Sequence, residues 1–78
     1  MIGGGTHLAT NVEAHITGTV FSIDTEVGAE IHEGDVLVVI ESMKMELPVE
    51  APVAGKVAEV RVEEGQSVEE GEVLVVLD

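Results

Sequence analysis

The chain has 78 residues, no cysteine and a formal net charge of −13, with 16 acidic residues against 3 lysines and arginines. This length suits one small domain, and the lack of cysteine excludes disulfides and thiolate metal sites. The acidic balance argues against binding nucleic acid or an anionic membrane surface through charge, so a partner surface is expected to be basic. No apolar run is long enough to cross a membrane, and the missing cysteines are compatible with the cytoplasm, where we expect the protein to work.

The apolar residues are nearly all aliphatic, with 15 valines and a single aromatic side chain, Phe21. β-branched residues fit a pleated strand better than a helix, and nine glycines divide the chain into short segments. No apolar stripe with a period of 3.6 residues is present, so the predicted class is all-β. Residues 1–11 contain three consecutive glycines and no strand pattern, and we interpret them as a flexible tail or linker before a folded domain at 12–78.

The folded part is an internal duplication. Residues 12–41 align with residues 49–78 without a gap, at a constant offset of 37, and 13 of the 30 aligned pairs are identical. Each copy predicts four strands: a short strand (12–16, 49–53), a longer strand after a turn at Gly18 or Gly55 (19–25, 56–62), a short strand around Ile31 or Val68 between turns at Gly28 and Gly34 or at Gly65 and Gly71, and an apolar strand (36–40, 73–77). Neither copy could bury its apolar face alone, so the two copies are expected to pack together.

Two copies of one unit usually pack about a two-fold axis. The prediction is therefore a flattened eight-stranded barrel-sandwich hybrid of two antiparallel four-stranded sheets, with pseudo-two-fold symmetry between residues 12–41 and 49–78. In the longer strands we expect Phe21, Ile23 and Thr25 on the inner face of the first copy, and Ala58, Val60 and Val62 on that of the second. Phe21 would then fill the space left in the core by the small Ala58.

The segment that joins the copies belongs to neither of them. A two-residue reversal at Met43-Lys44 would make a tight β-hairpin there, at the pole opposite the two chain ends. Neither residue is a preferred turn former, since such turns favour Asn and Gly. A local mismatch of this kind is expected at a functional site.

The sequence around this turn, Glu41-Ser42-Met43-Lys44-Met45-Glu46, resembles the attachment motif of biotinyl domains, the biotin carboxyl carrier modules of biotin-dependent carboxylases. It is also similar to small stand-alone biotin/lipoyl attachment proteins. In the family, the lysine carries biotin in amide linkage, which maps to Lys44. Ser42 stands where many members have Ala, and the gapless repeat leaves no room for the thumb-like insertion that some bacterial members have in the first copy.

The resemblance implies a carrier that is not itself an enzyme. Biotin on Lys44 would take a carboxyl group from a biotin carboxylase to a carboxyltransferase, with an acyl-CoA such as acetyl-CoA as the expected acceptor. A lysine amine is protonated and non-nucleophilic at neutral pH, so attachment requires a biotin protein ligase that supplies biotinyl-adenylate. Met43 and Met45 offer adaptable apolar contacts to the cofactor and to enzyme pockets, and Glu41, Met43 and Met45 are candidates for recognition by the ligase.

Two other functions remain open. A lipoyl-carrier domain of a 2-oxo acid dehydrogenase complex shares the fold and the hairpin lysine, although its hairpin typically reads Asp-Lys-Ala. An unmodified barrel-sandwich interaction domain is the alternative from another class. His7, His15 and His32 lack metal-ligand spacing, and no nucleophile–histidine–acid arrangement is present, so neither a metal site nor a catalytic site is predicted.

Overall fold

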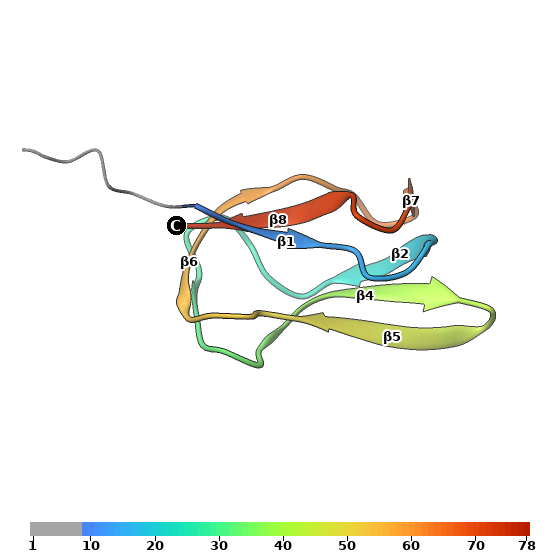
Figure 1. The fold of residues 1–78 in the computed structure, drawn as a ribbon, viewed down its shortest axis with the longest axis horizontal. Helices are drawn as coiled ribbons and strands as arrows, with labels where there is room; N and C mark the ends of the chain where they lie inside the picture. The colour runs from blue at the N-terminus through green and yellow to red at the C-terminus, as the bar shows by residue number, and fades with distance from the viewer. Residues whose placement is uncertain (1–8) are drawn as a thin grey trace, which may run out of the picture.

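A computed structural model describes residues 9–78 of the chain as a stack of two β-sheets (Figure 1). Residues 1–8, which hold most of the predicted tail, lie outside the described residues. The first strand begins at Thr10, two residues before the folded region predicted from the sequence. The strands in chain order are β1 Thr10–Glu13, β2 Gly18–Ile23, β3 Glu30–Ile31, β4 Val36–Ser42, β5 Met45–Glu50, β6 Gly55–Val60, β7 Ser67–Val68 and β8 Val73–Leu77.

The strand order confirms the pseudo-two-fold symmetry. One antiparallel sheet has the order β1-β8-β6-β3 and the other has the order β5-β4-β2-β7. Replacing each strand by its repeat mate (β1 by β5, β8 by β4, β6 by β2, β3 by β7) converts the first order into the second. Each sheet therefore contains two strands from each copy, so the two copies are interlocked and not stacked as separate layers.

Hydrogen bonds between the copies occur in symmetric pairs. The Gly28 amide donates to the Val57 carbonyl at 2.8 Å, and the Gly65 amide donates to the Val20 carbonyl at the same distance. Gly28 and Gly65 are repeat mates, with φ angles of 92° and 88° that a residue with a Cβ rarely adopts. The predicted turns at these glycines are confirmed, as are the turns at the other pair of repeat mates, Gly34 and Gly71, where φ is also positive.

The core lies between the two sheets and is aliphatic. The apolar strands β4 and β8 occupy interior positions in their sheets, as expected from their continuous apolar sequences. Fully burying one such side chain contributes about 1.5–3 kcal/mol relative to leaving it in water. The largest fully buried side chains are Leu37, Ile40, Leu74, Leu77, Val20, Val38, Val57, Val68 and Val75.

Phe21 is not part of this core, and the prediction that it offsets Ala58 there is wrong. Its side chain is 50% exposed. The register between β2 and β4 passes from Val20 directly to Ser22, so Phe21 is the extra residue of a β-bulge, and Ala58 is the extra residue of the matching bulge in β6. One extra residue shifts the inward–outward alternation, so Val20 and Val57 fill the inner positions instead.

Gly18 and Gly55 are also placed differently from the prediction. They are the first residues of β2 and β6 and not turn residues. At Gly18 an added Cβ would overlap the carbonyl oxygen of Glu41 and would lie 2.7 Å from Ile40 Cγ2. Glycine is therefore required here because a neighbouring strand approaches closely, and the sequence alone cannot distinguish this reason from a turn.

Candidate functional site

The hairpin between β4 and β5 forms one pole of the molecule, and the C-terminus lies at the other (Figure 1). Ser42 pairs with Met45, so Met43 and Lys44 alone form the loop. Their φ angles are 53° and 66°, both in the left-handed region, as in the type I′ turns that suit the twist of a hairpin. The predicted two-residue reversal at Met43-Lys44 is confirmed.

This turn carries local backbone strain. Met43 and Lys44 are the two non-glycine residues with positive φ among residues 9–78. For a residue with a Cβ, the left-handed conformation costs roughly 1–2 kcal/mol. Strained backbone that the surrounding structure maintains is typical of functional sites, so this turn is the strongest structural candidate in the described part of the chain.

Replacing Met43 by a residue that prefers this conformation should stabilise the protein. We expect Met43→Asn to raise the free energy of unfolding by about 1 kcal/mol, because Asn tolerates positive φ far better than Met. Urea denaturation measures the change. Met45→Asn is the matched control, since Met45 is also exposed but lies in strand β5, where Asn is unfavourable. An equal effect of the two substitutions would contradict the assignment of strain to the turn.

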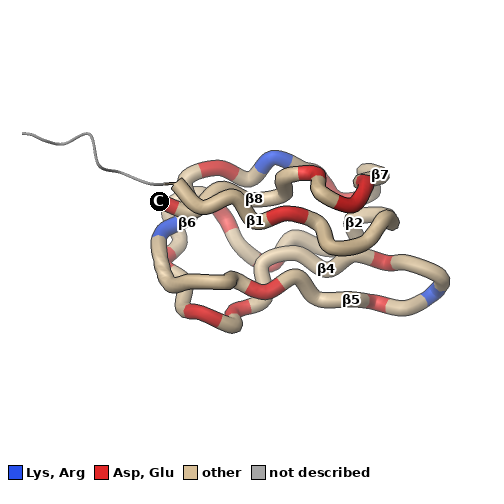
Figure 2. The backbone as a smooth tube through the Cα atoms, in the orientation of Figure 1, with Lys and Arg blue, Asp and Glu red and all other residues tan. Residues whose placement is uncertain are grey.

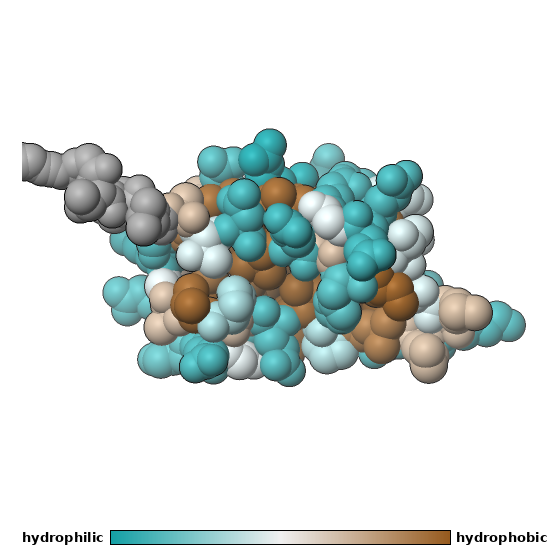
Figure 3. Space-filling model, viewed as in Figure 1, coloured by the Kyte–Doolittle hydropathy of each residue, from teal (hydrophilic) through white to brown (hydrophobic). Residues whose placement is uncertain are grey.

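The side chains of the turn project into solvent. Met43 is 88% exposed and Met45 55%, and Lys44 is exposed as well. The methionines therefore do not cap the core. In Figure 2, the hairpin tip shows the lysine in blue between two acidic segments, and Figure 3 shows apolar and hydrophilic side chains together where the hairpin extends beyond the body of the domain.

The predicted recognition residue Glu41 lies next to this tip. It pairs with Glu46 across β4 and β5, so their carboxylates belong to directly opposite positions on the same face. Within residues 9–78, neither carboxylate has a lysine, arginine or histidine nitrogen within 4.0 Å. Like charges at opposite positions repel each other, so this face is suited to a basic partner.

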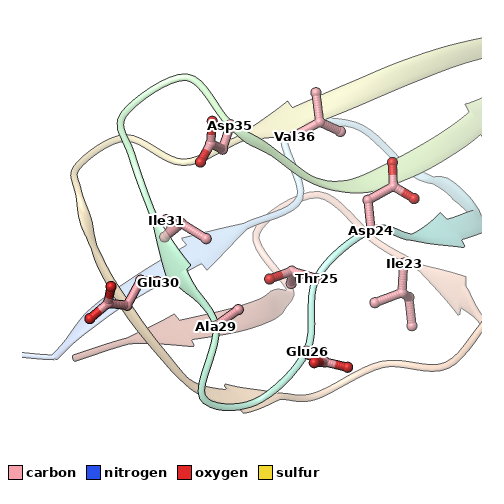
Figure 4. Close-up of a pocket in the computed structure, with 9 residues that line it drawn as sticks. All are labelled: Ile23, Asp24, Thr25, Glu26, Ala29, Glu30, Ile31, Asp35 and Val36. Carbon is pink, nitrogen blue, oxygen red and sulfur yellow. The ribbon is translucent and has the colours of Figure 1, made fainter.

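A hollow of about 670 Å³ lies apart from the lysine, beside the loop between β2 and β3 (Figure 4). Thr25 and Ala29 lie on its walls. The repeat mate of Ala29 is Gln66. Its side-chain amide accepts a hydrogen bond from the backbone amide of Glu63 at 3.1 Å and donates one to Glu72 Oε2 at 3.5 Å. Ala29 is smaller than Gln66, so the first copy has less side-chain volume at this position. Its lining residues are Ile23, Asp24, Thr25, Glu26, Ala29, Glu30, Ile31, Asp35 and Val36.

The described histidines do not form a metal site. His15 lies exposed between β1 and β2, and His32 lies in a turn with its Nδ1 3.7 Å from Asp35 Oδ2. Residues 9–78 contain no group of three histidine or acidic side chains that could hold a metal ion. His7 lies outside the described residues. In the same range, no helix has the length and apolar composition needed to span a membrane.

Comparison with known proteins identifies the family. Residues 10–77 match the family model described as biotin-requiring enzyme, which covers nearly all of the described chain. The chain belongs to this family. The match includes both repeats and the hairpin lysine, so the resemblance inferred from residues 41–46 extends to the whole domain.

Individual family members show similarity over shorter or longer ranges. The chain is 48% identical over 42 residues to the biotinylated protein TB7.3 homologs of Mycobacterium leprae and of Mycolicibacterium smegmatis, which covers 54% of this chain and 59% of those proteins. A single-chain, multi-domain long-chain acyl-CoA carboxylase superposes with a TM-score of 0.82 at 37% identity, over 87% of this chain and 7% of that one. Urea carboxylase of Kluyveromyces lactis superposes with a TM-score of 0.88 at 29% identity, over 97% and 7%.

Proposed function

We propose that this chain is a biotin carboxyl carrier domain and that biotin is attached to it in amide linkage at Lys44. The observation that carries the proposal is the strained two-residue turn, which displays an exposed lysine at the pole of an otherwise regular fold. The site fits the group, because an exposed primary amine at a hairpin tip can enter the active site of a ligase without unfolding the domain. Lys56, in β6, lies within a regular strand.

Attachment needs chemistry that the chain itself does not supply. An ordinary lysine amine is protonated at neutral pH, so a biotin protein ligase has to remove a proton before Lys44 Nζ can attack. Nζ then forms a bond to the acyl carbon of biotinyl-adenylate, and the bond from that carbon to the phosphate oxygen breaks. Adenylate leaves with the bonding electron pair, the nitrogen loses its second proton to the ligase or to water, and the product amide at Lys44 is neutral.

The fold positions the attachment point and restricts its motion. When attached, biotin supplies a nitrogen that accepts a carboxyl group at one active site and releases it at another. The hairpin is continuous with the central strand β4, so Lys44 moves with a rigid body and its tether confines the cofactor to a small volume. A tether of this kind raises the effective concentration at the active sites of a biotin carboxylase and a carboxyltransferase. Met43 and Met45 provide flexible apolar contacts at both.

An acyl-CoA carboxylase is the proposed context. The long-chain acyl-CoA carboxylase is more similar in sequence to this chain than the urea carboxylase, at 37% against 29% identity, which supports an acyl-CoA as acceptor. In the natural host, Lys44→Arg should abolish ATP-dependent fixation of labelled bicarbonate into an acyl-CoA. Urea-dependent fixation should be unchanged. Loss of the urea-dependent activity alone would assign the chain to a urea carboxylase instead.

A further inference from the structure

Phe21 exposes half of its surface on the sheet that carries the lysine hairpin. The pairing register gives the neighbours of this bulge on the outer face: Ser22 next to Phe21 pairs with Val39, and Val39 pairs with Pro48. Phe21, Val39 and Pro48 thus form an apolar band across β2, β4 and β5, which we call the outer band. Val39 is half-buried and Pro48 is exposed.

The outer band is present on only one of the two sheets. At the repeat mates of Phe21 and Pro48, the other sheet has Ala58 and Asn11, and Glu59 pairs with Val76 where Ser22 pairs with Val39. The two sheets share the same topology and the same bulge, so the fold itself does not require a large aromatic side chain at this position. The outer band lies on the sheet that carries Lys44 and is missing from the other sheet, which indicates a role connected with the lysine.

The outer band continues directly into the lysine site. The next outward-facing row toward the hairpin contains Thr19, Glu41 and Glu46, which pair across the same three strands. Lys44 follows at the tip, five residues from Val39, which is at most about 17 Å along the strands at about 3.3 Å per residue. A standard protein interface covers about 800 Å² on each partner, which is a patch about 30 Å across. One partner can therefore contact the outer band, the row of Thr19, Glu41 and Glu46, and Lys44 at the same time.

We propose that the outer band is the docking surface for the biotin protein ligase that modifies Lys44, an inference that rests on the proposed function. The ligase binds the unmodified chain, so it has no attached cofactor to hold and has to recognise the protein surface itself. Aromatic side chains at the centre of a contact commonly dominate binding, and Phe21 is the one aromatic residue of the chain. The paired carboxylates of Glu41 and Glu46 lie beside the outer band. The ligase surface is therefore expected to have an apolar pocket for Phe21 and basic residues next to that pocket.

The test is the kinetics of biotin attachment with purified ligase, biotin and ATP at varied concentrations of the chain. Phe21→Ala should lower kcat/KM about tenfold through a higher KM, with kcat little changed, as expected when a central aromatic contact is lost. Val27→Ala is the matched control, because Val27 is 64% exposed but lies in the loop between β2 and β3, and it should leave kcat/KM unchanged. Phe21→Leu should retain most of the activity.

Folding of the variants is expected, because Ala58 occupies the same bulge in the other sheet. If Phe21→Ala does not fold, Pro48→Asn provides an independent test that copies Asn11 of the other sheet, and it should also raise KM. Normal ligation kinetics of a folded Phe21→Ala variant would overturn the proposal. The same applies if ligation is normal and only carboxylation by the partner enzymes is slowed. Failure of the unaltered chain to accept biotin would instead contradict the proposed function.

Discussion

Lys44→Arg is expected to abolish biotin attachment while the domain folds normally. An arginine guanidinium stays protonated at any accessible pH, so it cannot attack the acyl carbon of biotinyl-adenylate. We expect labelling by purified ligase to fall by about a hundredfold or more, as for the loss of a nucleophile. Since Lys44 is exposed and the substitution keeps its charge, the free energy of unfolding should change by no more than about 0.5 kcal/mol.

The matched control for this prediction is Lys56→Arg. Lys56 is the other lysine of the chain, is exposed and lies in β6 with regular strand geometry. This variant should be labelled at the rate of the unaltered chain, as measured by intact-protein mass spectrometry over time. Persistent labelling of Lys44→Arg, together with its loss in Lys56→Arg, would move the attachment site away from the hairpin.

Gly18→Ala is expected to cause a large loss of stability. An added Cβ would overlap the Glu41 carbonyl oxygen and would lie 2.7 Å from Ile40 Cγ2, and Ile40 is fully buried in the core. Because β2 and β4 are neighbours in the interior of the sheet, the clash cannot be relieved by moving a flexible side chain alone. We expect a loss of about 3 kcal/mol, the upper part of the range for overpacking, which corresponds to a fall in Tm of roughly 12–24 °C.

The symmetry of the fold supplies the control. At Gly55, the repeat mate of Gly18, an added Cβ would lie 2.9 Å from the Asp78 carbonyl oxygen and 3.8 Å from Leu77 Cβ. These distances are longer, so Gly55→Ala should cost about 1 kcal/mol. Thermal denaturation of both variants measures the difference. A smaller loss at Gly18 than at Gly55 would contradict the close approach of β2 and β4.

The duplication made most of the fold predictable from the sequence. Because the copies align without a gap, residues 42–48 are left over as the connector between them, and the two-residue turn at Met43-Lys44 lies within this segment. The identical glycine pairs Gly28/Gly65 and Gly34/Gly71 mark turns for a local reason, namely positive φ, which a sequence can reveal. The continuous apolar sequences of strands β4 and β8 likewise predict their interior positions in the sheets.

The bulges and the exchange of strands could not be predicted in this way. Both copies contain the extra residue, Phe21 in one and Ala58 in the other, so the alignment between them stays gapless and hides it. A strict two-residue alternation then places Phe21 inside. The identical pair Val20/Val57 next to the bulge was the available signal, since these residues fill the core. Which copy contributes which strand to a sheet depends on contacts that are remote in sequence, and local patterns do not report them.

Part of the candidate site was likewise predictable from the sequence, and part of it was not. The sequence motif was sufficient to single out Lys44 and its neighbours Met43 and Met45, because they lie together in one short segment. The opposition of Glu41 and Glu46 and the outer band beside them depend on the register of three strands, which only the structure provides. Phe21 belongs to the outer band because the bulge turns its side chain outward, and the sequence alone does not predict this position.

The most direct test of the central claim is tandem mass spectrometry of the peptide that contains Lys44, from protein isolated from its natural host. We predict biotin in amide linkage on Lys44 Nζ and an unmodified Lys56. A lipoyl group on Lys44 would contradict the claim and assign the chain to a 2-oxo acid dehydrogenase complex. A bare Lys44 that stays bare with ligase, biotin and ATP would also contradict it and would indicate an unmodified interaction domain.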